Sequence, residues 1–224
     1  MQNLINPALW RVSDHFGSLI NNSPGIVSPD LILIEDTMEF DIVKGKFTGW
    51  RYNHDWSDKI WEERDYAFGH AVSIPQFHFG VYKMTAYLPD FRGSWPALWL
   101  VDITGKQGIP PEMDLFEQFR KDKCCTAHKV TATFHDGPIY GTSYSKNRRS
   151  WLSMDFLEVK FTWTPNVMLW EINGKEILQI TPSEVNKYPT LPMNLLVGHG
   201  LGNWGIEDHK LEPFIVLDLT YQPL

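Results

Sequence analysis

The sequence predicts an all-β fold, a jelly-roll sandwich of two curved antiparallel sheets with a concave cleft, formed by a single domain of residues 1–224. Three observations predict this fold. Short runs rich in β-branched and aromatic residues recur along the chain and alternate with polar residues. The 16 Gly and 15 Pro are spread between these runs, with no cluster that resembles a linker. Few segments show a helical period, and 224 residues suit one domain with a sizeable core.

The predicted strands follow one another at short intervals. The first 35 residues are the least regular, and there we expect an edge strand and long loops. The Asn173-Gly174 pair favours a tight hairpin turn, because Asn and Gly tolerate positive backbone φ angles. Residues 183–189 would form one helical turn. The clearest strand patterns are LILIED (31–36), FGVYKMTAYLP (79–89), KVTATFHDG (129–137), FLEVKFTW (156–163), NVMLWEI (166–172) and FIVLDLTYQ (214–222).

Composition excludes several classes of protein. A formal net charge of -7 disfavours nucleic acid as a partner, because such proteins normally present a basic face. No apolar run is long enough for a membrane span, and the N-terminus lacks the features of a secretory signal. We therefore expect no membrane partner, and we also expect a monomer. The compartment stays undetermined, since a leader could have been removed. The two cysteines, Cys124 and Cys125, are adjacent and do not suit a relaxed disulfide.

Three carboxylates alternate with large apolar residues in the segment PEMDLFEQF, residues 111–119. Side chains on a strand alternate between faces, so Glu112 and Asp114 point the same way, and regular alternation would send Glu117 into the apolar layer. One extra residue near Leu115, a β-bulge, would return Glu117 to the acidic face. We therefore predict a bulged strand with all three acids on one face.

This arrangement suits the hydrolysis of a glycosidic bond with retention of configuration. With the bulge, Glu112 and Glu117 lie roughly 13 Å apart along the backbone, and inward-leaning side chains bring their carboxylates to about 5 Å. We expect Glu112 to be the nucleophile and Glu117 the general acid/base. Asp114 would share a hydrogen bond with the nucleophile and keep the acid protonated. Taken alone, the motif would also fit a solvated strand face with alternating charge.

The surrounding segments resemble glycoside hydrolase family 16, whose active-site strand has the pattern ExDxE or, with a bulge, ExDxxE as in laminarinases, agarases and carrageenases. Matching segments occur in the family's order over roughly residues 66–222. Lys83, His199 and Asn173 depart from the family's usual Glu, Gly and Asp, and the first 60 residues match poorly, which leaves the substrate subsites open. The matching segments are Tyr66–Gly69, Phe77–Tyr82, Leu88–Pro89, Gly93–Leu100 (G-x-WPA-x-W), Trp163–Gly174, Met193–Gly198 and Val216–Asp218.

The resemblance implies sugar-binding residues beside the acids. Trp95 and Trp99 share one strand face and would form a platform near the cleavage point, with packing in the core as the alternative for either ring. His135 alternates outward from Phe134 on a neighbouring strand. It would hydrogen-bond the substrate or a site carboxylate, or else be a solvated histidine at a strand end.

The segment Gly200–Gly205 matches GxGxxG, but no helix or βαβ unit follows it, so we reject a dinucleotide site. We expect instead a loop that carries Trp204 near the cleft. The expected chemistry requires no cofactor, and the histidines lack zinc-like spacing. Asp218 resembles the residue that helps to hold a structural calcium in many relatives, so a calcium site at Asp218 is a further expectation.

We therefore expect an endo-acting hydrolase that cleaves a β-linked polysaccharide by double displacement, with a β-1,3- or mixed-linkage glucan as substrate. One alternative is a β-galactanase of the agarase or carrageenase type, because the bulged strand also occurs in galactan-cleaving relatives. The other is a non-catalytic carbohydrate-binding jelly-roll, which would also explain the 10 Trp. Three acids on one face favour an enzyme over a binding module.

Overall fold

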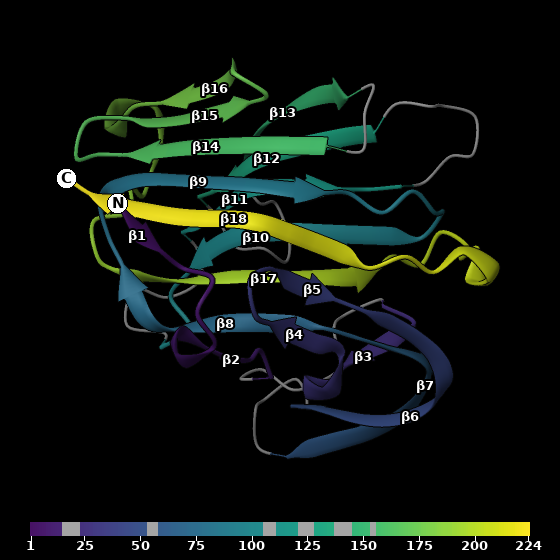
Figure 1. The fold of residues 1–224 in the computed structure, drawn as a ribbon. Helices are drawn as coiled ribbons and strands as arrows, with labels where there is room; N and C mark the ends of the chain where they lie inside the picture. Colours follow the sequence, from purple (N-terminus) through teal and green to yellow (C-terminus); the bar gives the residue numbers. More distant parts are fainter. Residues whose placement is uncertain (15–22, 53–57, 105–110, 121–127, 137–144, 153–155) are drawn as a thin grey trace.

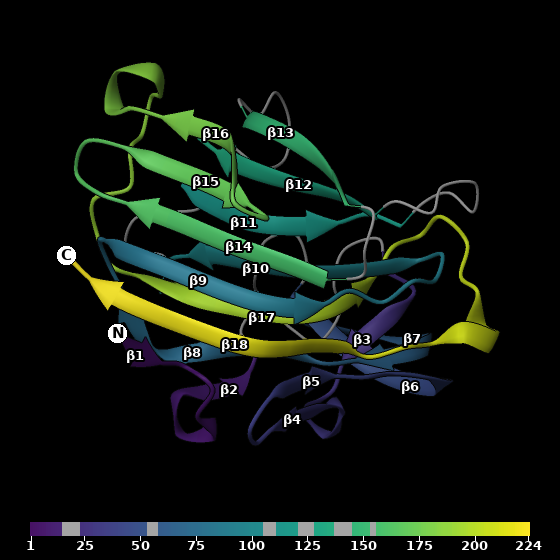
Figure 2. The same ribbon diagram turned by 45° about the horizontal axis from the view of Figure 1, so that its top comes forward.

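The computed structural model of the chain describes residues 1–14, 23–52, 58–104, 111–120, 128–136, 145–152 and 156–224. The two adjacent cysteines lie outside these residues. The described residues form two large antiparallel sheets, so the predicted all-β sandwich is confirmed. Figure 1 looks onto the eight-stranded sheet, with the seven-stranded sheet behind it, and Figure 2 shows the same two layers from a second direction.

The eight-stranded sheet contains both ends of the chain. Its N-terminal strand β1 pairs with the C-terminal strand β18, which places the two termini side by side (Figure 1). In spatial order the strands are β16 (Lys175–Ile180), β15 (Met168–Ile172), β14 (Phe156–Trp163), β9 (Gly80–Tyr87), β18 (Phe214–Pro223), β5 (Met38–Phe40) and β4 (Ile32–Ile34), with β1 (Gln2–Asn3) beside β18.

The seven-stranded sheet contains the acidic segment in its interior. In spatial order its strands are β13 (Ser145–Leu152), β12 (His128–His135), β11 (Glu112–Gln118), β10 (Ser94–Val101), β17 (Met193–Leu201), β8 (His70–Phe77) and β2 (Trp10–Val12). Because β11 has neighbours on both sides, its backbone is held in register by two ladders. This position gives the acidic side chains a rigid support.

A third, smaller sheet was not predicted. It consists of β3 (Gly25–Val27), β7 (Lys59–Phe68) and β6 (Ile42–Tyr52), and β3 pairs with β7 in parallel. Among the described residues of the first 35, there are four short strands instead of the single edge strand expected there. Each of these strands pairs over only two or three residues, which is too short to show an alternating pattern in the sequence.

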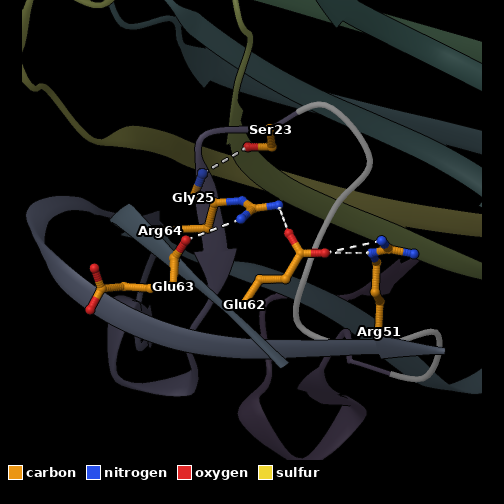
Figure 3. A network of polar contacts seen from close by, with 6 residues as sticks. All are labelled: Ser23, Gly25, Arg51, Glu62, Glu63 and Arg64. Carbon is orange, nitrogen blue, oxygen red and sulfur yellow. Dashed lines mark hydrogen bonds and ion pairs between the residues drawn. The ribbon is translucent and has the colours of Figure 1, made fainter. Parts of the chain in front are cut away.

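The long hairpin of β6 and β7 carries a network of charged side chains (Figure 3). The carboxylate of Glu62 accepts hydrogen bonds from Arg51 and from Arg64, and the Arg51 contacts measure 3.2 Å and 3.0 Å. The three side chains are only partly exposed. The pair of Arg51 and Glu62 crosses between the two strands and reinforces the register of the hairpin.

The main hydrophobic core lies between the two large sheets and follows the predicted alternation. In β9 and β14, buried residues occur at every second position. The largest buried side chains, Trp163 and Trp170, are unexposed, and their indole nitrogens donate to backbone carbonyl groups. This pairing satisfies polar groups that would otherwise destabilise the interior.

The predicted hairpin turn is confirmed. Ile172 pairs with Lys175, and the two central residues have positive φ angles of 48° at Asn173 and 73° at Gly174. Asn173 also uses its side chain, whose Oδ1 accepts a 2.7 Å hydrogen bond from the backbone N–H of Glu158. A carboxylate oxygen at this position would accept the same bond.

Short 3-10 helices occur at Pro7–Leu9, Pro29–Leu31, Pro182–Glu184 and Asp208–Lys210. The third begins one residue before the helical turn expected at residues 183–189, and a capping box formed by Thr181 and Glu184 stabilises it. Within the described residues, no helix has the length and apolar character needed to cross a membrane.

Candidate active site

Strand β11 contains the predicted bulge. Against β10, Phe116 pairs with Leu98 and Asp114 pairs with Trp99, so Leu115 is the extra residue. Against β12, the register also shifts between Asp114 and Glu117. Leu115 and Phe116 are both fully buried in the core between the sheets. The bulge therefore puts two consecutive apolar side chains into the core and turns Glu117 to the face of Glu112 and Asp114.

A tryptophan from the opposite sheet supports this bulge. The indole Nε1 of Trp170, on β15, donates a 3.0 Å hydrogen bond to the carbonyl oxygen of Asp114. A bulge interrupts the ladder, and a buried carbonyl left without a donor would be costly. The sequence gives no sign of this contact, because the two residues lie 56 positions apart.

Asp114 lies between the two glutamates. Its side chain is 4% exposed, and a carboxylate oxygen of Asp114 lies within 4.8 Å of one of Glu112, while the bulge puts Glu117 on the same face. His135, which pairs with Glu112 in the ladder between β11 and β12, has its Nε2 3.0 Å from Oδ2 of Asp114. On the other side, Nε1 of Trp95 donates a 3.1 Å hydrogen bond to Oε1 of Glu117. The acids thus form one connected cluster.

Burial is the largest cause of the raised pKa values in this cluster. It raises the pKa of Glu112 to about 8, with the negative charge of Asp114 adding to the effect. Burial also raises the pKa of Asp114 to about 7, although hydrogen bonds from Glu112 and Glu117 act in the opposite direction. For Glu117, burial and the charge of Asp114 raise the pKa well above its usual range, against the hydrogen bond from Trp95. Burial and the charge of Asp114 thus both favour the protonated form of Glu117, as a general acid requires.

The aromatic residues predicted beside the acids lie near them. Trp95 and Trp99 are both half-buried on β10, and Trp99 pairs with Asp114. Trp204 follows β17, and its ring centroid lies 6.1 Å from that of Trp95. Trp99 also packs against a small apolar cluster, so its ring is partly structural.

Asp218 lies apart from this group. It is exposed on β18, at a register shift opposite Thr85. Among the described residues, the one group of three His, Cys, Asp or Glu side chains spaced closely enough to hold a metal is Glu112, Asp114 and His135, whose ligand atoms lie within 4.8 Å of one another. Asp218 belongs to no such group within the part of the chain that the structure describes.

The sequence did not reveal His70, which lies on the same sheet face. Register places Glu117, Ala97, Gly198 and His70 in one row across β11, β10, β17 and β8. A Cβ on Gly198 would lie 2.2 Å from the imidazole of His70, so the glycine makes room for this ring. The His70 ring also packs edge-on against Trp99, with the ring centroids 5.6 Å apart. The alternation of His70 and Val72 on one strand face was the only local signal in the sequence. It does not tell which residues of the neighbouring strands lie beside His70.

The departure at His199 has a structural reason. This histidine points into the core, where Nε2 lies 3.0 Å from Oγ of Ser94 and Nδ1 lies 3.3 Å from the carbonyl of Phe40. Burial lowers its pKa to about 3, so the ring is neutral. It therefore does not change the acidic face.

Known proteins are similar to this chain in sequence and in fold. The sequence model of glycosyl hydrolases family 16 matches residues 41–210. Two endo-1,3-1,4-beta-glycanases of Rhizobium meliloti (strain 1021), EglC and ExsH, are each 29% identical over 138 residues, which make up 60% of this chain. The matched region covers 28% of the length of either relative.

Solved structures of low sequence identity share the fold. The laminarinase catalytic domain of Thermotoga maritima superposes with a TM-score of 0.71 at 18% identity, over 99% of this chain and 92% of its own. The catalytic domain LamAcat of Zobellia galactanivorans gives 0.74 at 18% identity, over 96% and 91%. A structure from work on endo-acting O-glycanases of the human gut microbiota gives 0.78 at 21% identity, over 97% and 86%.

The fold, the ordered sequence segments around the bulged acidic strand and the family match over residues 41–210 agree with one another. The chain belongs to family 16 of the glycosyl hydrolases.

Proposed function

We propose that this protein is an endo-acting glycoside hydrolase that cleaves a β-1,3- or mixed-linkage glucan with retention of configuration. The observation that carries the proposal is the acid cluster, in which Asp114 joins Glu112 and Glu117 on one face of a bulged strand. Retaining glycosidases use two carboxyl groups about 5–5.5 Å apart, and Glu112 and Glu117 flank Asp114 on the same face of this strand. The names of the relatives, endo-1,3-1,4-beta-glycanase and laminarinase, support the choice of glucan.

In the first step, the carboxylate of Glu112 attacks the anomeric carbon while Glu117 gives its proton to the leaving oxygen. The bond from the anomeric carbon to that oxygen breaks, and a glycosyl ester forms on Glu112. In the second step, Glu117 takes a proton from water, and the resulting oxygen nucleophile attacks the same carbon. The ester bond breaks, Glu112 leaves as a carboxylate, and Glu117 is again protonated.

Asp114 and His135 assist without bonding to the sugar. When Asp114 is charged, it disfavours ionisation of Glu117 and accepts a hydrogen bond from protonated Glu112. His135 fixes the orientation of Asp114 through the 3.0 Å contact. Proton sharing within this buried set lets Glu112 ionise while Glu117 stays protonated.

The half-buried rings of Trp95, Trp99 and Trp204 border the acids and would contact the apolar faces of sugar rings. A β-galactan is the second candidate substrate, because the bulged strand also fits galactan-cleaving members of the family. We further propose that the protein is a monomer that needs no metal for catalysis. A structural calcium at Asp218 would have to use backbone or water ligands, and calorimetric titration with calcium would detect it.

The experiment that tests the proposal is a panel of soluble polysaccharides, with product reducing ends and product length both measured. The panel contains laminarin, mixed-linkage β-glucan, agarose and carrageenan. We expect oligosaccharides of several lengths from laminarin or mixed-linkage glucan at early times, and none with Glu112→Gln. Cleavage of agarose or carrageenan instead would identify the galactanase. Binding without new reducing ends on any substrate would identify a non-catalytic binding module.

A further inference from the structure

We propose that Trp95, Phe119 and Trp204 form an aromatic clamp that holds the carboxyl group of Glu117 in the orientation needed for proton transfer, with Trp95 as the positioning residue. The inference rests on the proposed function, because it takes Glu117 as the general acid/base. It goes further by giving the three aromatic residues a role in the chemistry besides any contact with sugar.

The clamp acts on Glu117 through one hydrogen bond. Nε1 of Trp95 donates to Oε1 of Glu117 at 3.1 Å. Trp95 lies two positions before Ala97, the residue that pairs with Glu117 across β10 and β11. The two side chains are therefore neighbours on the same sheet face, and the indole reaches the carboxyl group from a paired strand.

Two rings hold the indole of Trp95 in place. The centroid of Trp95 lies 5.5 Å from that of Phe119 and 6.1 Å from that of Trp204. The centroids of Phe119 and Trp204 lie 6.0 Å apart, which closes the triangle. These distances are typical of tilted aromatic packing, in which each ring limits the rotation of the others.

Trp204 anchors this triangle to the backbone. Its Nε1 donates a 2.7 Å hydrogen bond to the carbonyl of Arg120. The same carbonyl accepts a 3.0 Å bond from the N–H of Gly93, just before β10 begins. The loop after β17 is thus tied to the ends of both strands that carry Trp95 and Glu117.

Gly202 explains part of the glycine-rich segment at residues 200–205. A Cβ on Gly202 would lie within 1.8 Å to 2.0 Å of three ring atoms of Trp204, so only glycine allows the indole to lie there. The glycine therefore makes room for the Trp204 ring of the clamp. It also offers a way to displace Trp204 without changing any aromatic residue.

The hydrogen bond has a chemical consequence, because a donor to a carboxylate favours its charged form. Trp95 lowers the pKa of Glu117 against the larger effect of burial, which raises it. Glu117 must give a proton in the first step and take one in the second. The clamp therefore moderates a pKa that burial alone would raise further.

The test compares Trp95→Phe with the wild type. Phenylalanine keeps a ring in the triangle but removes the N–H donor. We expect kcat/KM at neutral pH to fall about tenfold and the alkaline limb of its pH profile to move upward by about one unit. Carboxyl-carbon NMR of Glu117 should show the same upward shift in its titration. Gly202→Ala, which displaces Trp204, should move both readouts in the same direction by a smaller amount.

Two controls separate positioning from general damage. Trp99→Phe alters a ring on the same strand that pairs with Asp114 and contacts His70, so it should raise KM without moving the alkaline limb. Trp61→Phe alters a ring that is 61% exposed on β7 and should change neither readout. An unchanged Glu117 titration in both Trp95→Phe and Gly202→Ala would overturn the clamp even if hydrolysis is observed. A shifted titration in a protein that hydrolyses no polysaccharide would instead overturn the proposed function and leave the clamp standing.

Discussion

Replacing Glu112 by Gln should stabilise the protein at alkaline pH while it abolishes turnover. Burial raises the pKa of Glu112 from 4.5 to about 8, so the folded protein binds more protons than the unfolded chain between these two values. Stability therefore falls as pH rises through this range, and the loss persists above it. Glutamine has the same shape as the protonated acid and carries no charge at any pH, so the variant escapes this loss.

The expected size of the effect follows from the shift. Each pKa unit corresponds to about 1.4 kcal/mol, so the full shift of Glu112 would be worth roughly 5 kcal/mol. Because the three acids titrate together, part of that free energy passes to Asp114 and Glu117 when Glu112 is neutralised. If the substitution relieves only one unit of the pKa shift, it should still raise the thermal midpoint of a domain of this size by roughly 3–6 °C.

Calorimetric or fluorescence melts of both proteins at pH 4 and pH 9 measure this effect. We expect nearly equal midpoints at pH 4 and a higher midpoint for Glu112→Gln at pH 9. Glu158→Gln, the same change at an exposed site on β14, serves as the control and should leave the midpoint within about 1 °C. A variant that is no more stable than the wild type at pH 9 would show that Glu112 is not a strained, buried acid.

Three further predictions concern the acidic strand and its surroundings. Asp114→Asn should lower kcat at least about 100-fold with an unchanged circular dichroism spectrum, and near-normal turnover with an unaltered pH profile would show that Asp114 is only structural. Deletion of Leu115 removes the bulge and should turn Glu117 into the core, so activity on every substrate is lost; an active deletion variant would contradict the register. Asp136→Ala removes three hydrogen bonds, of 2.6 Å, 3.1 Å and 2.9 Å, that the Asp136 carboxylate accepts from Asn186 and Lys187. It should lower the free energy of unfolding, measured in urea, by about 2 kcal/mol. An unchanged midpoint would show that other contacts hold this loop.

The parts of the fold that could be predicted are those whose own residues carry the pattern. Strands β9 and β14 alternate buried residues with partly or fully exposed ones over their whole length, and the turn at Asn173-Gly174 requires no distant partner. The bulge in β11 was predictable for a different reason. Without it, a charged glutamate would have entered the core, and that cost is visible in the sequence alone.

The remaining features depend on pairs of residues far apart in the chain. The register between β8 and β17 decides that His70 lies in the row of Glu117, and no local pattern encodes it. The contact of Trp170 with the backbone of Asp114 crosses between the two sheets. Trp95 was predicted as a sugar platform from its strand face, but its hydrogen bond to Glu117 depends on how β10 pairs with β11 across the bulge.

The most direct test of the two glutamate roles is the anomeric configuration of the products formed with azide by Glu112→Gly and Glu117→Ala. Glu112→Gly removes the nucleophile and leaves a space that azide can enter. Azide should then attack a β-glycosyl fluoride directly from that side and give the α-glycosyl azide. Glu117→Ala should still form the glycosyl ester from a substrate with a good leaving group, and azide should then give the β-glycosyl azide. Swapped configurations would reverse the roles, and undiminished activity of both variants on the natural polysaccharide would show that β11 does not carry the active site.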